Sequence, residues 1–270
     1  MIQPDTLLIA FGLTALAGLS TAIGSFLAFF TKRTNTKFLS ASLGFSAGVM
    51  IYVSFMELMP LANDYLLSFA NGGPAAQWIA AASFFGGMLL VALIDRLVPT
   101  FENPHEPHKV EEINHPDRHK FKKLYHTAMF TALAIAIHNF PEGLATFAAA
   151  LSDPTLGVAI AFAIAIHNIP EGIAVSVPLY YATANKKKAF TLSALSGLAE
   201  PLGALVGFLI LMPFLNSAVF GILFSSIAGI MVFISIDELL PAAQKFGHHH
   251  LSIYGLIAGM AIMALSLIMI

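Results

Sequence analysis

The sequence predicts an all-α, polytopic membrane protein with eight membrane-spanning helices. Hydrophobic residues make up 57% of the 270 positions and charged residues 10%, whereas a soluble domain has about 45–50% and about 25%. The apolar stretches are about 20 residues or longer, enough at about 1.5 Å per residue to cross a hydrocarbon core of roughly 30 Å. A third observation is that several of these stretches resemble one another.

The whole chain, 1–270, is predicted to form one transmembrane domain. Its first apolar stretch lacks a basic start and is too long for a secretory signal, so it is expected to be a span. The chain has no cysteine, which excludes disulfides and thiolate metal ligands. The predicted spans are at about 5–30, 38–62, 75–98, 126–150, 155–183, 188–212, 217–241 and 251–270.

Lysine and arginine predict the orientation, because these residues collect in cytoplasmic segments of membrane proteins. With eight spans and the N-terminus outside, all 13 lysine and arginine residues fall on the cytoplasmic side. An odd number of spans would scatter them across both sides. Both termini are therefore expected outside the cytoplasm.

Two stretches far apart in the chain share a pattern. "AGVMIYVSFMELMP" at 47–60 aligns without gaps to "AGIMVFISIDELLP" at 228–241. A weaker pair, "AGLSTAIGSFLAFF" from Ala17 and "SGLAEPLGALVGFL" from Ser196, sets Thr21 opposite Glu200. The paired spans run in opposite directions, so spans 1–3 and 6–8 form an inverted repeat around central spans 4 and 5, a recurrent design of transporters.

The central spans carry a second repeat, "HNFPEG" from His138 and "HNIPEG" from His167. Residues four apart lie on one face of a helix, so His138 with Glu142, and His167 with Glu171, can each grip one ion. Two imidazoles and two carboxylates suit tetrahedral zinc, but also iron(II), manganese, cobalt and cadmium.

Each motif also contains an asparagine and a proline. Asn139 and Asn168 lie three residues before the carboxylates, so each glutamate can share a second ion with an asparagine. Pro141 and Pro170 have no N–H and are expected to kink the helices and free carbonyl oxygens. Structural kinks and helix-to-helix hydrogen bonds are the alternative explanation.

Charge in the bilayer is costly, at about 2.5–3.5 kcal/mol per group at its centre. Glu142 and Glu171 have no lysine or arginine within their predicted spans, and the span of Glu200 has only Lys188, at its cytoplasmic end. A divalent cation would neutralise these carboxylates. Glu200 is therefore a further candidate ligand. Three other acidic residues lie near span ends, where they are expected to contact either water or an ion pathway. They are Glu57, Asp237 and Glu238. Asp95 is expected to form an ion pair with Arg96.

The segment at about 99–125 is predicted to be a histidine-containing cytoplasmic loop. It is either a solvated loop or a weak metal-binding tract. Its histidines are His105, His108, His115 and His119.

At these motifs the chain resembles the ZIP family of metal-ion transporters over essentially its whole length. The resemblance implies a zinc site and a neighbouring second site in which iron can bind, with Glu142 and Glu171 shared by both. It also implies uptake into the cytoplasm across the bacterial inner (plasma) membrane by alternating access, without ATP. The implied zinc ligands are His138, Glu142, His167 and Glu171; the second set is Asn139, Glu142, Asn168, Glu171 and Glu200.

The function expected is therefore uptake of divalent metal ions: zinc, with iron, manganese, cobalt or cadmium as further substrates. The metal is cargo and no cofactor is expected; the partners are metal ions and the lipid bilayer, not nucleic acid, with a homodimer as one option. A passive channel and a metal-sensing receptor are the alternatives on the same scaffold. An intramembrane metallopeptidase is a remote one, because its HExxH string is absent, and the chain is not expected to be an enzyme.

Overall fold

The computed structural model describes residues 4–27, 29, 36–97, 118–183, 185–211, 214, 216–245 and 248–269. Within these residues it is helical and contains no β-strand, which confirms the predicted all-α class. The helices, with π-helical turns labelled η, are α1 (Pro4–Leu27), α2 (Thr36–Val53), η2 (Ser54–Leu58), α3 (Met59–Phe69), α4 (Ala75–Leu97), α5 (Arg118–Ser152), α6 (Pro154–Thr183), α7 (Lys186–Gly197), α8 (Ala199–Val206), η4 (Gly207–Leu211), α9 (Ser217–Ile234), η6 (Ser235–Leu239), α10 (Leu240–Lys245) and α11 (His249–Met269).

Seven helical stretches of the described chain are long and apolar enough to cross a membrane, and each coincides with a predicted span. The remaining predicted span, at about 126–150, lies inside α5. This helix has 35 residues, ample length for a crossing at about 1.5 Å per residue. It is not among the seven, so a total of eight spans stays a prediction. The seven are Pro4–Leu27, Lys37–Phe69, Ala75–Arg96, Pro154–Val177, Lys186–Ile210, Ser217–Gln244 and His249–Met269.

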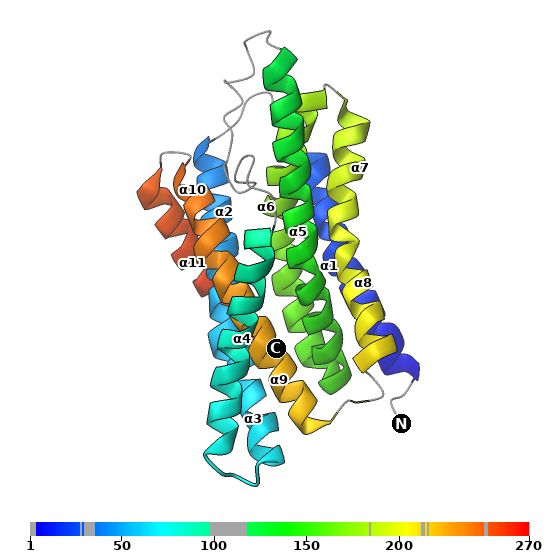
Figure 1. Cartoon of the computed structure of the whole chain (residues 1–270), viewed down its shortest axis with the longest axis vertical. Helices are drawn as coiled ribbons and strands as arrows, with labels where there is room; N and C mark the ends of the chain where they lie inside the picture. Colours follow the sequence, from blue (N-terminus) through cyan, green and yellow to red (C-terminus); the bar gives the residue numbers. More distant parts are fainter. Residues whose placement is uncertain are drawn as a thin grey trace.

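The helices associate in two groups (Figure 1). In the first, α1, α5, α6, α7 and α8 pack mainly on one another; we call it the central bundle. In the second, α2 packs on α11, and α9 packs on α3 and α4; we call it the flanking bundle. The two bundles meet chiefly where α2 contacts α6 and where α9 contacts α5.

Glycines bring the helix backbones of the central bundle into contact. A Cβ atom at Gly24 in α1 would overlap the carbonyl oxygen of Ile169 in α6, and one at Gly203 in α8 would overlap that of Phe140 in α5. Small residues permit such close approach between membrane helices. The two contacts join equivalent positions of the sequence repeats, so they are consistent with the inverted repeat.

The flanking bundle contains a corresponding pair of contacts. A Cβ atom at Gly48 in α2 would overlap the carbonyl oxygen of Leu256 in α11, and one at Gly229 in α9 would overlap that of Phe84 in α4. Gly48 and Gly229 are aligned glycines of the longer repeat. The second predicted span (α2) therefore packs on the eighth (α11) in the same way as the seventh (α9) packs on the third (α4).

The π-helical turns η2 and η6 occupy aligned positions of the same repeat. In η2 the Met59 N–H donates to the Ser54 carbonyl, and in η6 the Leu240 N–H donates to the Ser235 carbonyl. The hydroxyls of both serines donate to carbonyls four residues earlier, each at 2.7 Å, a bond that often bends a helix. A proline follows each turn at Pro60 and Pro241 and supplies no N–H.

Candidate metal site

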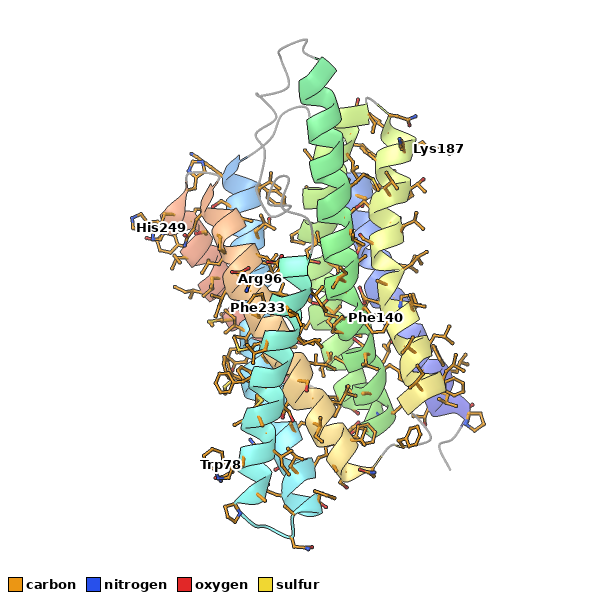
Figure 2. The ribbon with its side chains drawn as sticks, in the orientation of Figure 1. Trp78, Arg96, Phe140, Lys187, Phe233 and His249 are labelled. Atoms are coloured by element: carbon orange, nitrogen blue, oxygen red, sulfur yellow. The ribbon has the colours of Figure 1, made fainter. Side chains whose placement is uncertain are left out.

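The two His-Asn-x-Pro-Glu-Gly motifs lie on α5 and α6, which pack against each other. Both helices continue past Pro141 and Pro170, so neither proline ends its helix. Figure 2 places Phe140, inside the first motif, about midway between the end of the structure bearing Lys187 and the end bearing Trp78. The motifs therefore sit in the middle of the molecule's length.

The described side chains of the predicted site are buried. Glu142 is 1% exposed and the others are fully buried, although glutamate and asparagine side chains are mostly exposed in proteins. The side chain of His138 lies outside the described residues, and only its backbone is placed, in α5. The fully buried predicted residues are Asn139, His167, Asn168, Glu171 and Glu200.

His167 links α6 to α5. Its Nδ1 lies 3.1 Å from the carbonyl oxygen of Ala163, and its Nε2 lies 3.2 Å from Glu142 Oε1. Because a carbonyl oxygen can only accept a hydrogen bond, Nδ1 carries a proton and donates to Ala163. The other ring nitrogen, Nε2, faces the carboxylate of Glu142. Metal-binding histidines are typically held in this way, with the second nitrogen anchored on a backbone carbonyl.

The two asparagines are anchored through their amide nitrogens. Asn168 Nδ2 donates to the Ala17 carbonyl at 3.1 Å and also to Glu200 Oε1, while Asn139 Nδ2 donates to the Ser196 carbonyl at 3.4 Å. Ala17 and Ser196 are aligned in the sequence repeat. Since the nitrogens face the carbonyls of α1 and α7, the amide oxygens remain available to a ligand.

Buried oxygen atoms around these residues have no hydrogen-bond partner within the described part of the chain. Four of them are Asn139 Oδ1, Asn168 Oδ1, Glu200 Oε2 and Thr21 Oγ1, and a fifth, Thr146 Oγ1, belongs to the residue one turn after Glu142 in α5. Leaving a buried polar atom unsatisfied costs about 1–3 kcal/mol. Carboxylate, amide and hydroxyl oxygens are donors for hard divalent cations, so a bound cation would remove this cost.

The site concentrates negative charge. Glu142, Glu171 and Glu200 lie close enough for their charges to repel one another, and His167 in its protonated form would attract Glu142 and Glu171. The described lysines and arginines lie at or near helix ends, away from these carboxylates. A divalent cation is the simplest group that would offset three buried carboxylates.

Among the side chains that the structure describes, no three His, Asp or Glu residues converge closely enough to hold one metal ion. The predicted four-residue zinc set includes His138, whose side chain lies outside that part. The structure thus brings together His167 with Glu142 and Asn168 with Glu200, and the complete ligand sets remain predictions.

Other sequence candidates lie apart from this cluster or outside the described chain. His105, His108 and His115 lie outside the described residues, as does the side chain of His119. Glu57 lies in η2 and is half-buried, while Asp237 and Glu238 lie in η6. The charges of Asp95, Asp237 and Glu171 repel that of Glu238, which relates Glu238 to the site electrostatically.

Thr21 was aligned with Glu200 in the sequence but was not predicted as a site residue. It is fully buried, and its hydroxyl is among the unpartnered oxygens. The alignment was the available signal, because it sets a polar α1 residue at the position that Glu200 holds in the other repeat.

The helical spans define a polytopic membrane protein, and its described part contains a cluster of buried polar side chains at mid-length. Residues 100–267 match the model of the family described as ZIP Zinc transporter. The chain belongs to this family, as the sequence motifs predicted.

Relatives match over nearly the full length. A protein of Lysinibacillus sphaericus named zinc transporter ZupT is 60% identical over 265 residues, covering 97% of this chain and 98% of the relative. A zinc transporter ZupT of Streptococcus mutans is 60% identical over 260 residues, covering 96% and 97%. A zinc transporter ZupT of Nitratidesulfovibrio vulgaris is 56% identical over 276 residues, covering 100% and 99%.

Proposed function

We propose that this chain carries divalent metal ions, zinc above all, into the cytoplasm by alternating access, with the metal bound between α5 and α6. The observation that carries this proposal is the group of buried carboxylates and unpartnered oxygens at mid-length. The names of the relatives support zinc as a substrate. The oxygen-rich half of the site supports manganese or iron(II) as further substrates, and the imidazole-containing half supports cobalt or cadmium.

The proposed ligands fall into two sets that share Glu142 and Glu171. His138 and His167 would complete a zinc site, because imidazole and carboxylate are the donors zinc prefers without thiolates. The amide oxygens of the two motif asparagines and the free oxygen of Glu200 would complete a harder, all-oxygen site. The anchoring of each asparagine through its nitrogen supports this division.

The proposed orientation places both termini outside the cytoplasm of a bacterial cell, in its inner membrane. Helices α2, α5 and α7 begin at one end of the structure, and the N-terminus lies at the opposite end (Figure 1). Basic residues cluster in the sequence at these three starts, including Lys37, Arg118 and Lys187. That end would face the cytoplasm by the positive-inside rule.

Exposed leucine, isoleucine and phenylalanine side chains on the outer helices support the lipid bilayer as the surrounding medium. The proposal also includes a homodimer. No catalytic activity is proposed, since metal is cargo in this scheme.

Uptake by purified protein in liposomes tests the function. We expect zinc uptake that saturates with concentration and that Glu142→Ala or Glu171→Ala nearly abolishes. The matched control is Asp64→Ala, which removes an exposed carboxylate on α3 and should leave uptake unchanged. Near-normal uptake by either glutamate variant would refute the shared site.

Counterflow separates a carrier from the passive channel. Liposomes preloaded with zinc should take up tracer zinc faster than empty ones if the protein alternates between two states. Uptake that never saturates and shows no counterflow would identify a channel, and absence of any uptake would favour a sensor.

A further inference from the structure

Thr21 differs from the other buried hydroxyl residues of α1. Thr14 Oγ1 donates to the Ala10 carbonyl at 2.8 Å, and Ser25 Oγ donates to the Thr21 carbonyl at 2.8 Å. Both bonds return to the helix's own backbone, as is common for such residues. Thr21 is fully buried, yet its Oγ1 has no hydrogen-bond partner among the described residues.

The reason lies one turn earlier in α1. The carbonyl oxygen of Ala17 already accepts from Ser20 Oγ at 2.6 Å and from Asn168 Nδ2 at 3.1 Å. A carbonyl oxygen has two lone pairs, and the helix also uses this oxygen as the acceptor for the backbone N–H four residues later. The site asparagine therefore takes the acceptor that the Thr21 hydroxyl would otherwise use.

The surroundings of Thr21 repeat those of Glu200. A Cβ atom at Gly172, next to Glu171, would overlap the Thr21 carbonyl, and one at Gly143, next to Glu142, would overlap the Glu200 carbonyl. The backbone of Thr21 thus contacts the residue after one shared glutamate, as the backbone of Glu200 contacts the residue after the other.

The side chain of Thr21 also lies beside the α7 segment that anchors Asn139. A Cβ atom at Gly197 would lie 3.0 Å from Thr21 Cβ and 3.1 Å from Thr21 Oγ1. Asn139 donates to the neighbouring Ser196 carbonyl. The hydroxyl is therefore close to the residues that hold the amide of one proposed ligand.

We propose that the Thr21 hydroxyl is a further oxygen ligand of the all-oxygen half of the site and a determinant of its metal selectivity. The inference rests on the proposed function and deepens it. Because the repeat places a hydroxyl in α1 where it places a carboxylate in α8, the all-oxygen half of the site would receive a neutral donor from α1 and a charged one from α8. A neutral hydroxyl oxygen is a better ligand for manganese(II) and iron(II) than for zinc, which prefers the neighbouring imidazole ligands.

The test replaces the hydroxyl without changing the shape of the side chain. Thr21→Val removes only the donor, Thr21→Ser keeps it, and Thr14→Val removes an equally buried hydroxyl two turns away on the same helix. Manganese binding to the detergent-purified protein is measured by electron paramagnetic resonance, and uptake in liposomes is measured with manganese and zinc supplied together.

We expect Thr21→Val to weaken manganese binding by about tenfold and to lower the manganese-to-zinc uptake ratio by a similar factor. Thr21→Ser and Thr14→Val should keep the wild-type ratio. An unchanged ratio in Thr21→Val, or an equal loss for both metals, would overturn the inference. Thr21→Ala provides a second hydroxyl-free variant if the valine variant does not fold, and the same outcomes apply.

The glutamate variants separate this inference from the function on which it depends. If Glu142→Ala and Glu171→Ala lose uptake while Thr21→Val keeps the wild-type ratio, Thr21 is not a ligand and the transport function stands. If the glutamate variants retain uptake, the site itself is misplaced.

Discussion

Glu200→Gln is a specific test of the division of the site into two halves. Glu200 is fully buried in the first turn of α8, and its two oxygens have different surroundings. Oε1 accepts from Asn168 Nδ2, and Oε2 has no hydrogen-bond partner among the described residues. Glutamine keeps an oxygen for the Asn168 bond and replaces the other oxygen by an amide nitrogen, which cannot bind a cation.

The structure sets the size of the expected effect. The Asn168 bond can survive, so the cost to folding should be small. The cost to metal binding is the loss of one charged ligand contact, comparable to a hydrogen bond with a charged group at about 1.5–3 kcal/mol. At about 1.4 kcal/mol per decade, iron or manganese affinity should fall roughly 10- to 100-fold. Zinc held mainly by imidazole and the shared glutamates should change by less than about threefold.

Competition uptake in liposomes, with zinc and iron(II) supplied together, measures the ratio directly. Glu57→Gln is a useful comparison, because it changes a half-buried glutamate in η2 that lies outside the proposed ligand sets. A Glu200→Gln protein that loses both metals in equal proportion would refute the division and identify one inseparable binuclear unit.

Three further predictions concern the rest of the molecule. His138→Ala and His167→Ala should each raise the zinc concentration for half-maximal uptake by about tenfold, measured in liposomes, because each removes one of the proposed ligands while leaving both shared carboxylates; unchanged values would contradict imidazole ligation. Replacing the four histidines of the 99–125 loop with alanine should leave liposome uptake largely intact, and a dead variant would make the loop part of the pathway. Gly24→Ala should lower the melting temperature in detergent, because the added Cβ would overlap an α6 carbonyl. Gly12→Ala should not lower it, since nothing lies within 4 Å of the position that its Cβ would take. Equal melting temperatures of the two variants would contradict the close backbone contact.

The helices were predictable from the sequence because long apolar runs fix both their existence and their approximate ends. The length of the second span was underestimated, because the sequence predicted an end near residue 62, whereas the helix continues to Phe69. Asn63 and Asp64 lower the hydropathy there but do not break a helix. The chain turns later, where Asn71 and Gly72 adopt positive φ angles of 50° and 76°, a conformation that these two residue types tolerate.

Some features depend on packing between helices and had no local signal. The break between α7 and α8 at Leu198 was not predicted, although Pro201 supplies the cause, because it removes the N–H that would continue the helix. The burial of the motif residues followed from their position in apolar spans. The unpartnered Thr21 hydroxyl did not, because it depends on Asn168 reaching across from α6 to the Ala17 carbonyl.

The paired π-helical turns have a consequence for how this chain can change during evolution. Each turn holds one residue more than an α-helical path would, which rotates every later side chain of that helix by about 100°. A one-residue deletion in η2 alone would turn α3 relative to α9 and leave the α9–α10 helix unaltered. The two halves would then present different faces to their neighbours, so insertions and deletions at these two distant points of the chain are expected to persist only as matched pairs.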